Sequence, residues 1–154
     1  MSTIVLKFGG TSVATTDLIK SAAGIIKKEH DAGNNVAVVV SAMAGTTNSL
    51  IKYVEEINAN LDPEYDVVVS SGEQVTSGLM SMALNEIGVP SRSWQGWQLP
   101  ILTSGSHRNS VIKKIYPEKI IEGFKEKQVA VLAGFQGLSV NDRITTIGRG
   151  GSDN

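Results

Sequence analysis

Two short runs of apolar residues restrict the possible folds of this chain more than any other feature. Residues 36–40 read Val-Ala-Val-Val-Val and residues 129–133 read Val-Ala-Val-Leu-Ala, without intervening polar residues. A strand with one face in water alternates apolar and polar residues, so these unbroken runs are typical of strands buried on both faces. Helix-like patterns surround both runs. The chain is therefore predicted to be an α/β protein with a mostly parallel sheet between two helical layers, a three-layer α/β/α sandwich.

Apolar residues at helical spacing predict the helices of these layers. The first is expected to begin at Thr15 or Thr16, either of which can cap it, and to end at the Gly33 turn. Further helices are expected around residues 50–57, 73–87 and 117–124. Further strands are expected at residues 4–6 and 91–95, with a short strand or hairpin near residues 144–145. The pattern leaves open whether residues 67–69 form a strand, and it indicates mainly loop over residues 96–109.

Composition excludes several classes of protein. The chain has 154 residues, which suits one domain with its own core, and 41% of them are hydrophobic. A net charge of −1 without a long basic run gives no sign of nucleic-acid or membrane partners. The absence of cysteine excludes disulfides, thiolate metal sites and a cysteine nucleophile. The apolar run at residues 4–6 is too short for a signal peptide or membrane span, which predicts a cytoplasmic protein.

The stretch from Ile4 to Val13, I-V-L-K-F-G-G-T-S-V, suits a bound phosphate. Glycines let the backbone approach an anion, and the N–H groups of a turn and of a helix start can donate to it. Lys7 would add a positive charge beside that site. The same pattern is also compatible with an ordinary strand-to-helix turn. It is not a P-loop, because G-x-x-x-x-G-K-[ST] is absent.

Polar, glycine-rich segments follow three of the predicted strands, after Leu6, Val40 and Ala133. In open parallel sheets, ligands bind at the carboxyl ends of the strands. The three segments are therefore expected to meet in one ligand site.

Five motifs, taken together, resemble those of aspartate kinases, which belong to the amino-acid kinase superfamily. They are K-F-G-G-T-S at residues 7–12, V-V-V-S-A-M-A-G-T-T-N at 38–48, S-S-G-E at 70–73, A-G-F-Q-G at 133–137 and I-G-R-G-G-S-D at 147–153. They occur in the family's order and span the chain. The resemblance implies transfer of the γ-phosphoryl group of ATP, bound with Mg²⁺, to the side-chain carboxylate of L-aspartate. The product, 4-phospho-L-aspartate, leads toward lysine, threonine and methionine.

The resemblance also implies roles for the residues that match the motifs. The phosphate-binding set comprises Lys7, Phe8, Gly9, Gly10 and Ser41. The substrate-binding set comprises Thr47, Glu73, Arg149 and Ser152. Glu73 suits an α-ammonium group, and the planar guanidinium of Arg149 suits a carboxylate. Lys7 and Asp153 are the catalytic pair, in which Lys7 stabilises the transferring group and Asp153 orients Lys7 or neighbouring groups.

Plainer roles stay open for several of these residues. Ser41 and Thr47 can serve only as helix caps, and Glu73 can be a solvated carboxylate in the first turn of a helix. Phe135 is expected in a pocket wall or the core, and His107 on the surface or in a hydrogen bond. Trp94, Trp97, Met43, Met80 and Met82 are expected to serve in packing. Residues 103–112 depart from the family pattern at Ser104 and Ser110, so the sequence assigns no site residue in that loop and leaves its role open.

Family members continue beyond G-R-G-G-S-D into a nucleotide-binding half and ACT regulatory domains. Residues 1–154 therefore resemble the N-terminal, acceptor-binding part of the kinase domain. Such a chain is expected to be inactive or nearly so by itself and to leave a sheet edge unpaired and a face uncovered. One alternative is a non-catalytic protein that binds aspartate and pairs with itself or with a C-terminal portion. A second is a kinase of another amino-acid acceptor, against which S-S-G-E and G-R-G-G-S-D argue.

Overall fold

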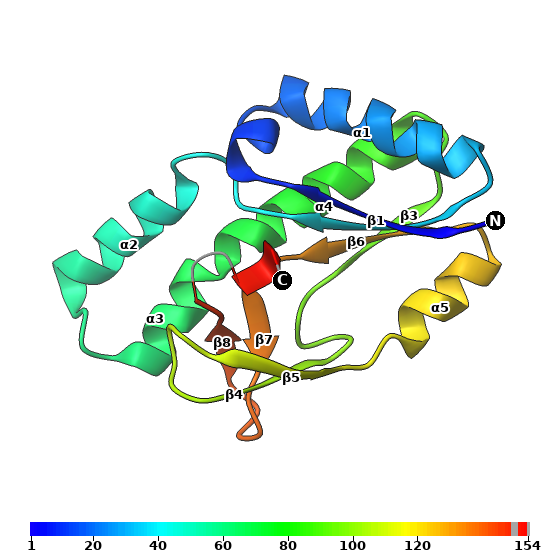
Figure 1. Cartoon of the computed structure of the whole chain (residues 1–154). Coiled ribbons are helices and arrows are strands. Elements are labelled where there is room, and N and C mark those ends of the chain that lie inside the picture. Colours follow the sequence, from blue (N-terminus) through cyan, green and yellow to red (C-terminus); the bar gives the residue numbers. More distant parts are fainter. Residues whose placement is uncertain (149–150, 154) are drawn as a thin grey trace.

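The computed structural model describes residues 1–148 and 151–153, which contain both helices and strands (Figure 1). The strands are β1 (Thr3–Phe8), β2 (Asn35–Val40), β3 (Ser91–Trp94), β4 (Ile101–Ser104), β5 (Val111–Ile115), β6 (Val129–Ala133), β7 (Gln136–Leu138) and β8 (Ile144–Thr146). The helices are α1 (Thr16–Asp31), α2 (Thr46–Ile57), α3 (Asp62–Val69), α4 (Ser71–Glu86) and α5 (Glu118–Lys125). Two short 3₁₀ helices are η1 (Gly10–Val13) and η2 (Gly151–Asp153).

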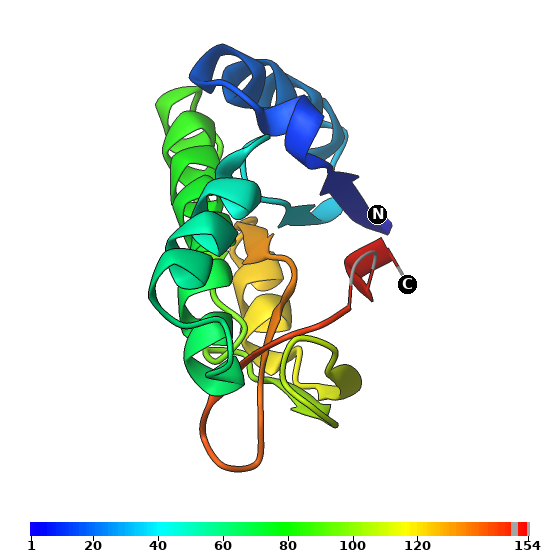
Figure 2. The same cartoon turned by 90° about the vertical axis from the view of Figure 1, so that its left-hand side faces the viewer.

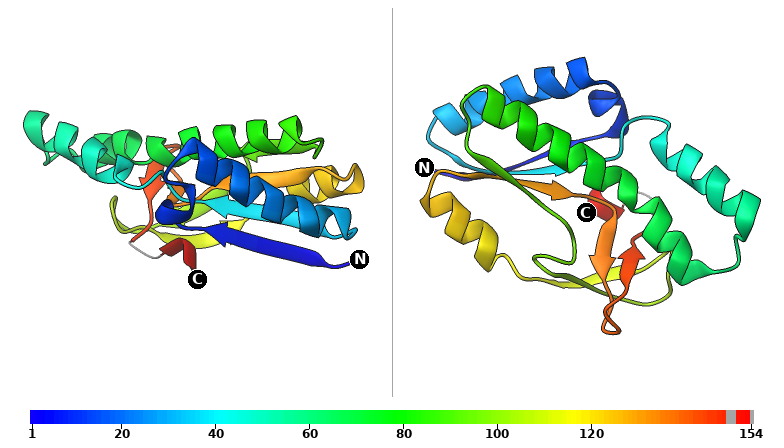
Figure 3. Two further views of the ribbon diagram at one scale, coloured as in Figure 1. Left: turned by 90° about the horizontal axis from the view of Figure 1, so that it is seen from above. Right: turned by 180° about the vertical axis from the view of Figure 1, so that it is seen from behind.

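The main sheet has the strand order β1-β2-β6-β3, and all of its neighbouring strands are parallel. Helices α1 and α4 cover one face and α5 covers part of the other (Figures 2 and 3). The predicted α/β architecture with a mostly parallel sheet is thus confirmed. Figure 1 shows the smaller sheet, of order β5-β4-β7-β8, beside the carboxyl end of β6.

The two apolar runs form the centre of the main sheet, as predicted. On the α1/α4 face, buried side chains of β2 and β6 pack against Ile19, Ile26, Met80 and Leu84, each at most 2% exposed. On the opposite face, Ala130 of β6 packs with Ile120 of α5. Both faces of β6 are therefore removed from water, which explains its lack of polar residues.

The main sheet is open at β1. This strand is one of the two edge strands of the sheet, the other being β3. Val5 at the centre of β1 is 67% exposed. A cavity of about 580 Å³ lies on the same face, lined by Ala37 of β2 and by Ile120 and Phe124 of α5, among others. The expected unpaired edge and incompletely covered face are therefore features of this structure.

Three local predictions need correction or completion. Residues 67–69 belong to α3, because Pro63 suits the first turn of a helix that continues through them. Residues 96–109 contain β4, and the following β5 was not predicted at all. The two strands pair with each other, and β4 also pairs with β7; local patterns do not encode these pairings. Met82, expected in packing, is 69% exposed.

Helices α1 and α4 begin at residues that the sequence analysis had identified. Thr15, not Thr16, caps α1, and its hydroxyl accepts a hydrogen bond from Leu18 N at 3.2 Å. Helix α4 begins directly after α3, so the S-S-G-E motif forms a junction between the two helices and Glu73 lies in the first turn of α4.

Gly72 permits α4 to pack closely on the loop that follows β2. A Cβ atom at Gly72 would lie 2.8 Å from Ala42 Cβ and 3.3 Å from Thr46 Cγ2, so Gly72→Ala must displace this loop. We expect a loss of about 1–3 kcal/mol in the free energy of unfolding, measured with urea. Gly78→Ala in the same helix is the control, because nothing lies within 4 Å of its added Cβ; it should stabilise by about 0.5–1 kcal/mol. Equal effects of the two substitutions would contradict the close packing.

Candidate functional site

A cavity of about 490 Å³ lies where the carboxyl ends of β1, β2 and β6 meet. Lys7 reaches it from β1, Ser41 follows β2, and Phe135 follows β6. Six residues of the predicted phosphate, substrate and catalytic sets line it together: Lys7, Gly10, Ser41, Thr47, Glu73 and Asp153. The three glycine-rich strand ends therefore contribute to one cavity.

Other predicted residues lie differently. Phe8 is half-buried against the core under α1 and α4, and neither it nor Gly9 belongs to the described lining. Ser41 N donates to Phe8 O at 3.1 Å, so Phe8 supports the cavity through its backbone. Arg149 lies outside the described residues, and so does the side chain of Ser152.

The loop after β2 forms one wall of the cavity. Gly45 adopts a left-handed conformation with φ +85° and is the N-cap of α2, without a capping side chain. Ser41 and Thr47 therefore do not cap α2, which removes their plainer role there. The N-terminus of α2 lies at the cavity, where the partial positive charge of the helix favours an anion.

Glu73 is the most unusual group in the lining. It is only 4% exposed, its Oε1 accepts a hydrogen bond from Ala42 N at 3.2 Å, and its Oε2 has no partner among the described residues. Burial raises the pKa of Glu73 to about 7, and the hydrogen bond from Ala42 N opposes that shift only in part. The alternative that Glu73 is a solvated carboxylate is therefore wrong, and an oxygen without a partner among the described residues is suited to a cationic donor.

Lys7 and Asp153 form an ion pair across the cavity mouth. The Lys7 side chain is 30% exposed and the Asp153 side chain 61% exposed, so water reaches this pair. Such a pair contributes little stability. It holds the ammonium group at the end of β1, however, and can open to let Lys7 contact an anion.

Three of the lining residues that the sequence did not identify have polar side chains: Tyr65 on α3, Thr146 on β8, and Arg108. Arg108 lies in the loop at residues 103–112, whose role the sequence left open. Its φ of +67° and the same value at Phe135 are rare for residues other than glycine. Such strain often accumulates at functional sites. No local sequence signal identifies Arg108, because its loop acquires its place through contacts with α3.

No helix in residues 1–148 or 151–153 is long and apolar enough to cross a membrane. Within the same residues, no group of three or more His, Cys, Asp and Glu side chains could hold a metal ion.

Known proteins resemble this chain in sequence. The aspartate kinase of Pseudomonas fluorescens (strain SBW25) is 48% identical and the aspartokinase of Pseudomonas aeruginosa PAO1 is 50% identical, each over 99% of this chain. The chain spans only 38% and 37% of the length of these two relatives.

Solved structures agree with the sequence comparison. Aspartate kinase from Synechocystis matches with a TM-score of 0.79 and 38% identity, covering 97% of this chain and 24% of that one. Aspartokinase III of E. coli, in complex with aspartate and ADP, matches with a TM-score of 0.80 and 25% identity, covering 97% of this chain and 44% of that one. The family described as "Amino acid kinase family" matches residues 2–154. This chain belongs to the amino acid kinase family.

Proposed function

We propose that this chain forms the amino-acid-binding part of an aspartate kinase. The observation that carries the proposal is the buried Glu73, which lines a cavity that also holds Lys7 and whose Oε2 has no partner among the described residues. A carboxylate in that position favours an ammonium-bearing ligand, and the cation beside it favours an anionic group on the same ligand. An amino acid with an acidic side chain has both kinds of group. The names of the relatives and the aspartate and ADP in the E. coli structure support aspartate as that amino acid.

The proposed reaction transfers the γ-phosphoryl group of ATP to the side-chain carboxylate of L-aspartate. A bond forms between a carboxylate oxygen and the γ-phosphorus, the bond from that phosphorus to the β,γ-bridging oxygen breaks, and ADP leaves. The nucleophile is already ionised, so no strong base is required. The protein contributes by holding two anions in line and by neutralising the charge that develops between them.

Each described group has a part in this chemistry. Glu73 binds the α-ammonium group, and Thr47 and Ser41 offer hydroxyl groups at the α2 end of the cavity. Lys7 leaves Asp153 to contact the transferring phosphoryl group, and Gly10 keeps the backbone open there. Arg149 and Ser152 complete the substrate-binding set. Mg²⁺ enters with ATP, and we assign it no protein ligands.

Two hypotheses remain: a kinase that binds both aspartate and ATP, and a non-catalytic protein that binds only aspartate. Measuring nucleotide binding distinguishes them. The chain spans less than two fifths of the length of its relatives, and positioning fails when one reactant is not held. We therefore expect this chain alone to bind L-aspartate but to phosphorylate it poorly or not at all.

Calorimetric titration tests the proposal, with L-aspartate, L-asparagine and MgATP as separate titrants. We expect L-aspartate to bind and L-asparagine to bind at least tenfold more weakly, because the side-chain carboxylate is lost. Lys7→Met should weaken aspartate binding several-fold, whereas Lys27→Met, which breaks only the exposed pair with Asp31, should not. Phosphorylation would be detected by trapping the acyl phosphate with hydroxylamine. Absence of L-aspartate binding to the folded chain would refute the proposal.

A further inference from the structure

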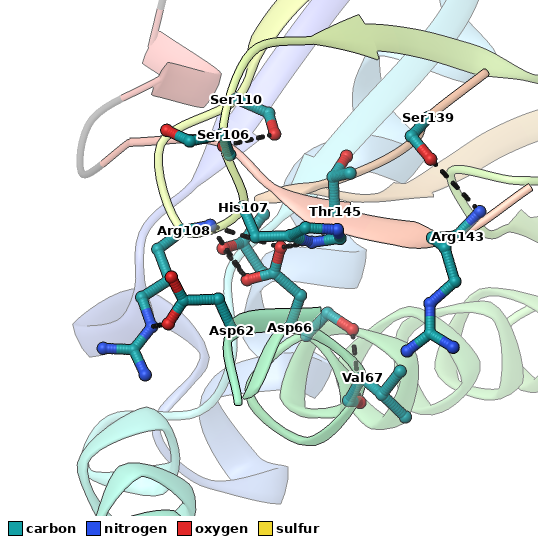
Figure 4. Close-up of polar contacts among 12 residues, drawn as sticks. Asp62, Asp66, Val67, Ser106, His107, Arg108, Ser110, Ser139, Arg143 and Thr145 are labelled. Carbon is teal, nitrogen blue, oxygen red and sulfur yellow. Dashed lines mark hydrogen bonds and ion pairs between the residues drawn. The ribbon is translucent and has the colours of Figure 1, made fainter. Parts of the chain in front are cut away.

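A buried carboxyl group joins three segments behind the cavity wall (Figure 4). Asp66 of α3 is fully buried, and its Oδ2 lies 2.6 Å from His107 Nδ1. Both of its oxygens accept from Arg108 N at 3.2 Å, and Oδ1 also accepts from Thr146 Oγ1 at 2.7 Å. One side chain thus fixes α3, the loop at residues 105–110 and β8 to one another.

Arg108 is held in an uncommon position by these contacts. Its backbone has φ +67°, which is unfavourable for a residue with a Cβ atom, and the N–H contacts with Asp66 stabilise it. Its guanidinium lies 3.8 Å from the centre of the Tyr65 ring, and Nη2 donates to Ala59 O. Nε lies 2.8 Å from Asp62 Oδ1, a carboxylate that is 52% exposed. The cation is therefore fixed in place while its partner stays largely in water.

The charge balance of the cavity depends on the Arg108 cation. Among the described lining residues, Lys7 and Arg108 are positive and Glu73 and Asp153 are negative. Without Arg108, that described set would have one cation against two carboxyl groups and would repel an anionic ligand. Asp62 is not among the described lining residues, and its side chain is 52% exposed to water.

We infer that Arg108 is a specificity-determining residue, which presents a fixed positive charge to an anionic group of the ligand, and that Asp66 is the positioning residue that holds it there. The identity of the ligand as L-aspartate rests on the proposed function. The competing explanation is that Arg108 only fastens the loop to α3.

Arg143 is a natural control for that competing explanation. It fastens the segment between β7 and β8 to α3 through an ion pair of 2.5 Å between Nη2 and Glu64 Oε1. Its side chain is 40% exposed, against 35% for Arg108, but it does not line the cavity. Figure 4 shows both arginines beside the same helix.

The test is calorimetric titration of the whole chain with L-aspartate at two ionic strengths. We expect Arg108→Gln to weaken binding about tenfold and to reduce its salt dependence, with Arg108→Lys within about threefold of the unmodified chain. Arg143→Gln should leave affinity unchanged. Asp66→Asn should weaken binding as Arg108→Gln does, and the two changes combined should weaken it no further, because both act through one cation.

Several outcomes overturn the inference. Equal affinities of the Arg108→Gln and Arg143→Gln variants would make Arg108 a fastening residue only, as would failure of Arg108→Lys to retain binding. Thermal unfolding identifies variants that do not fold; if Arg108→Gln is among them, Arg108→Lys and the salt dependence decide. If the unmodified chain binds no L-aspartate, the proposed function fails. Inorganic pyrophosphate then replaces L-aspartate as the anionic probe. Pyrophosphate binding that depends on Arg108 but not on Arg143 would then support the inference, and any other result would overturn it.

Discussion

Glu73→Gln is expected to stabilise the unliganded chain above pH 7 and to weaken its binding of L-aspartate by roughly a hundredfold. Burial raises the pKa of Glu73 from 4.5 to about 7, so between these values the folded chain binds more protons than the unfolded chain. The stability of the unmodified chain should therefore decrease as pH rises from about 4.5 to about 7. Over this pH range the free energy of unfolding should fall by on the order of 3 kcal/mol. Glutamine keeps the acceptor for Ala42 N and avoids the buried charge.

Urea unfolding at pH 4 and pH 8 measures the first part of this prediction. The gain in free energy of unfolding from Glu73→Gln should appear at pH 8 and disappear at pH 4, where the glutamate is protonated in both states. Glu86→Gln, on the exposed last residue of the same helix, is the matched control and should change stability little at either pH. A gain of equal size at both pH values would show that the buried charge is not its cause.

The binding part of the prediction follows from the same carboxyl group. An ammonium group at Oε2 favours the ionised form of Glu73, so binding of L-aspartate at pH 6 should release protons. Calorimetry in two buffers of different ionisation enthalpy measures that release. Persistence of the proton release in the Glu73→Gln variant would assign it to another group.

Asp66→Ala is expected to lower the free energy of unfolding by about 3 kcal/mol or more. Removing this buried carboxyl group leaves His107 Nδ1, Arg108 N and the Thr146 hydroxyl without their acceptor. The comparison is Asp62→Ala, one turn earlier on α3, which removes a half-exposed partner of Arg108 and should cost less than about 1 kcal/mol. Chemical denaturation of both variants measures the difference. Similar losses for the two would mean that the buried cluster is not the stabilising element.

The sequence was sufficient to predict features that depend on local pattern. The apolar runs at residues 36–40 and 129–133 predicted buried parallel strands, and the Thr15 cap and Gly33 stop bounded α1. The strand ends that carry Lys7 and Ser41 indicated where the cavity lies. These features depend on burial, propensity and the general rule for ligands at the ends of parallel strands.

Features that depend on distant contacts could not be predicted. The hydrogen bonds of β4 join it to β5 and β7, and the local sequence does not indicate which segments pair. The place of Arg108 depends on Asp66, which is 42 residues earlier in the chain. The pKa of Glu73 depends on burial beneath the β2 loop, and the S-S-G-E motif does not contain that information. Charge environments of this kind require the tertiary structure.

The open edge of the main sheet and Lys7, the proposed phosphate-binding residue, belong to the same strand. Asn35 N donates to Ser2 O and Ser41 N donates to Phe8 O, so every second residue of β1 is turned toward β2. The intervening Thr3, Val5 and Lys7 direct their backbone N–H and C=O groups outward. A strand added at this edge would bond to the backbone of Lys7 itself. If association at the edge changes the affinity of the cavity for an anion, anion binding must change the association by the same factor.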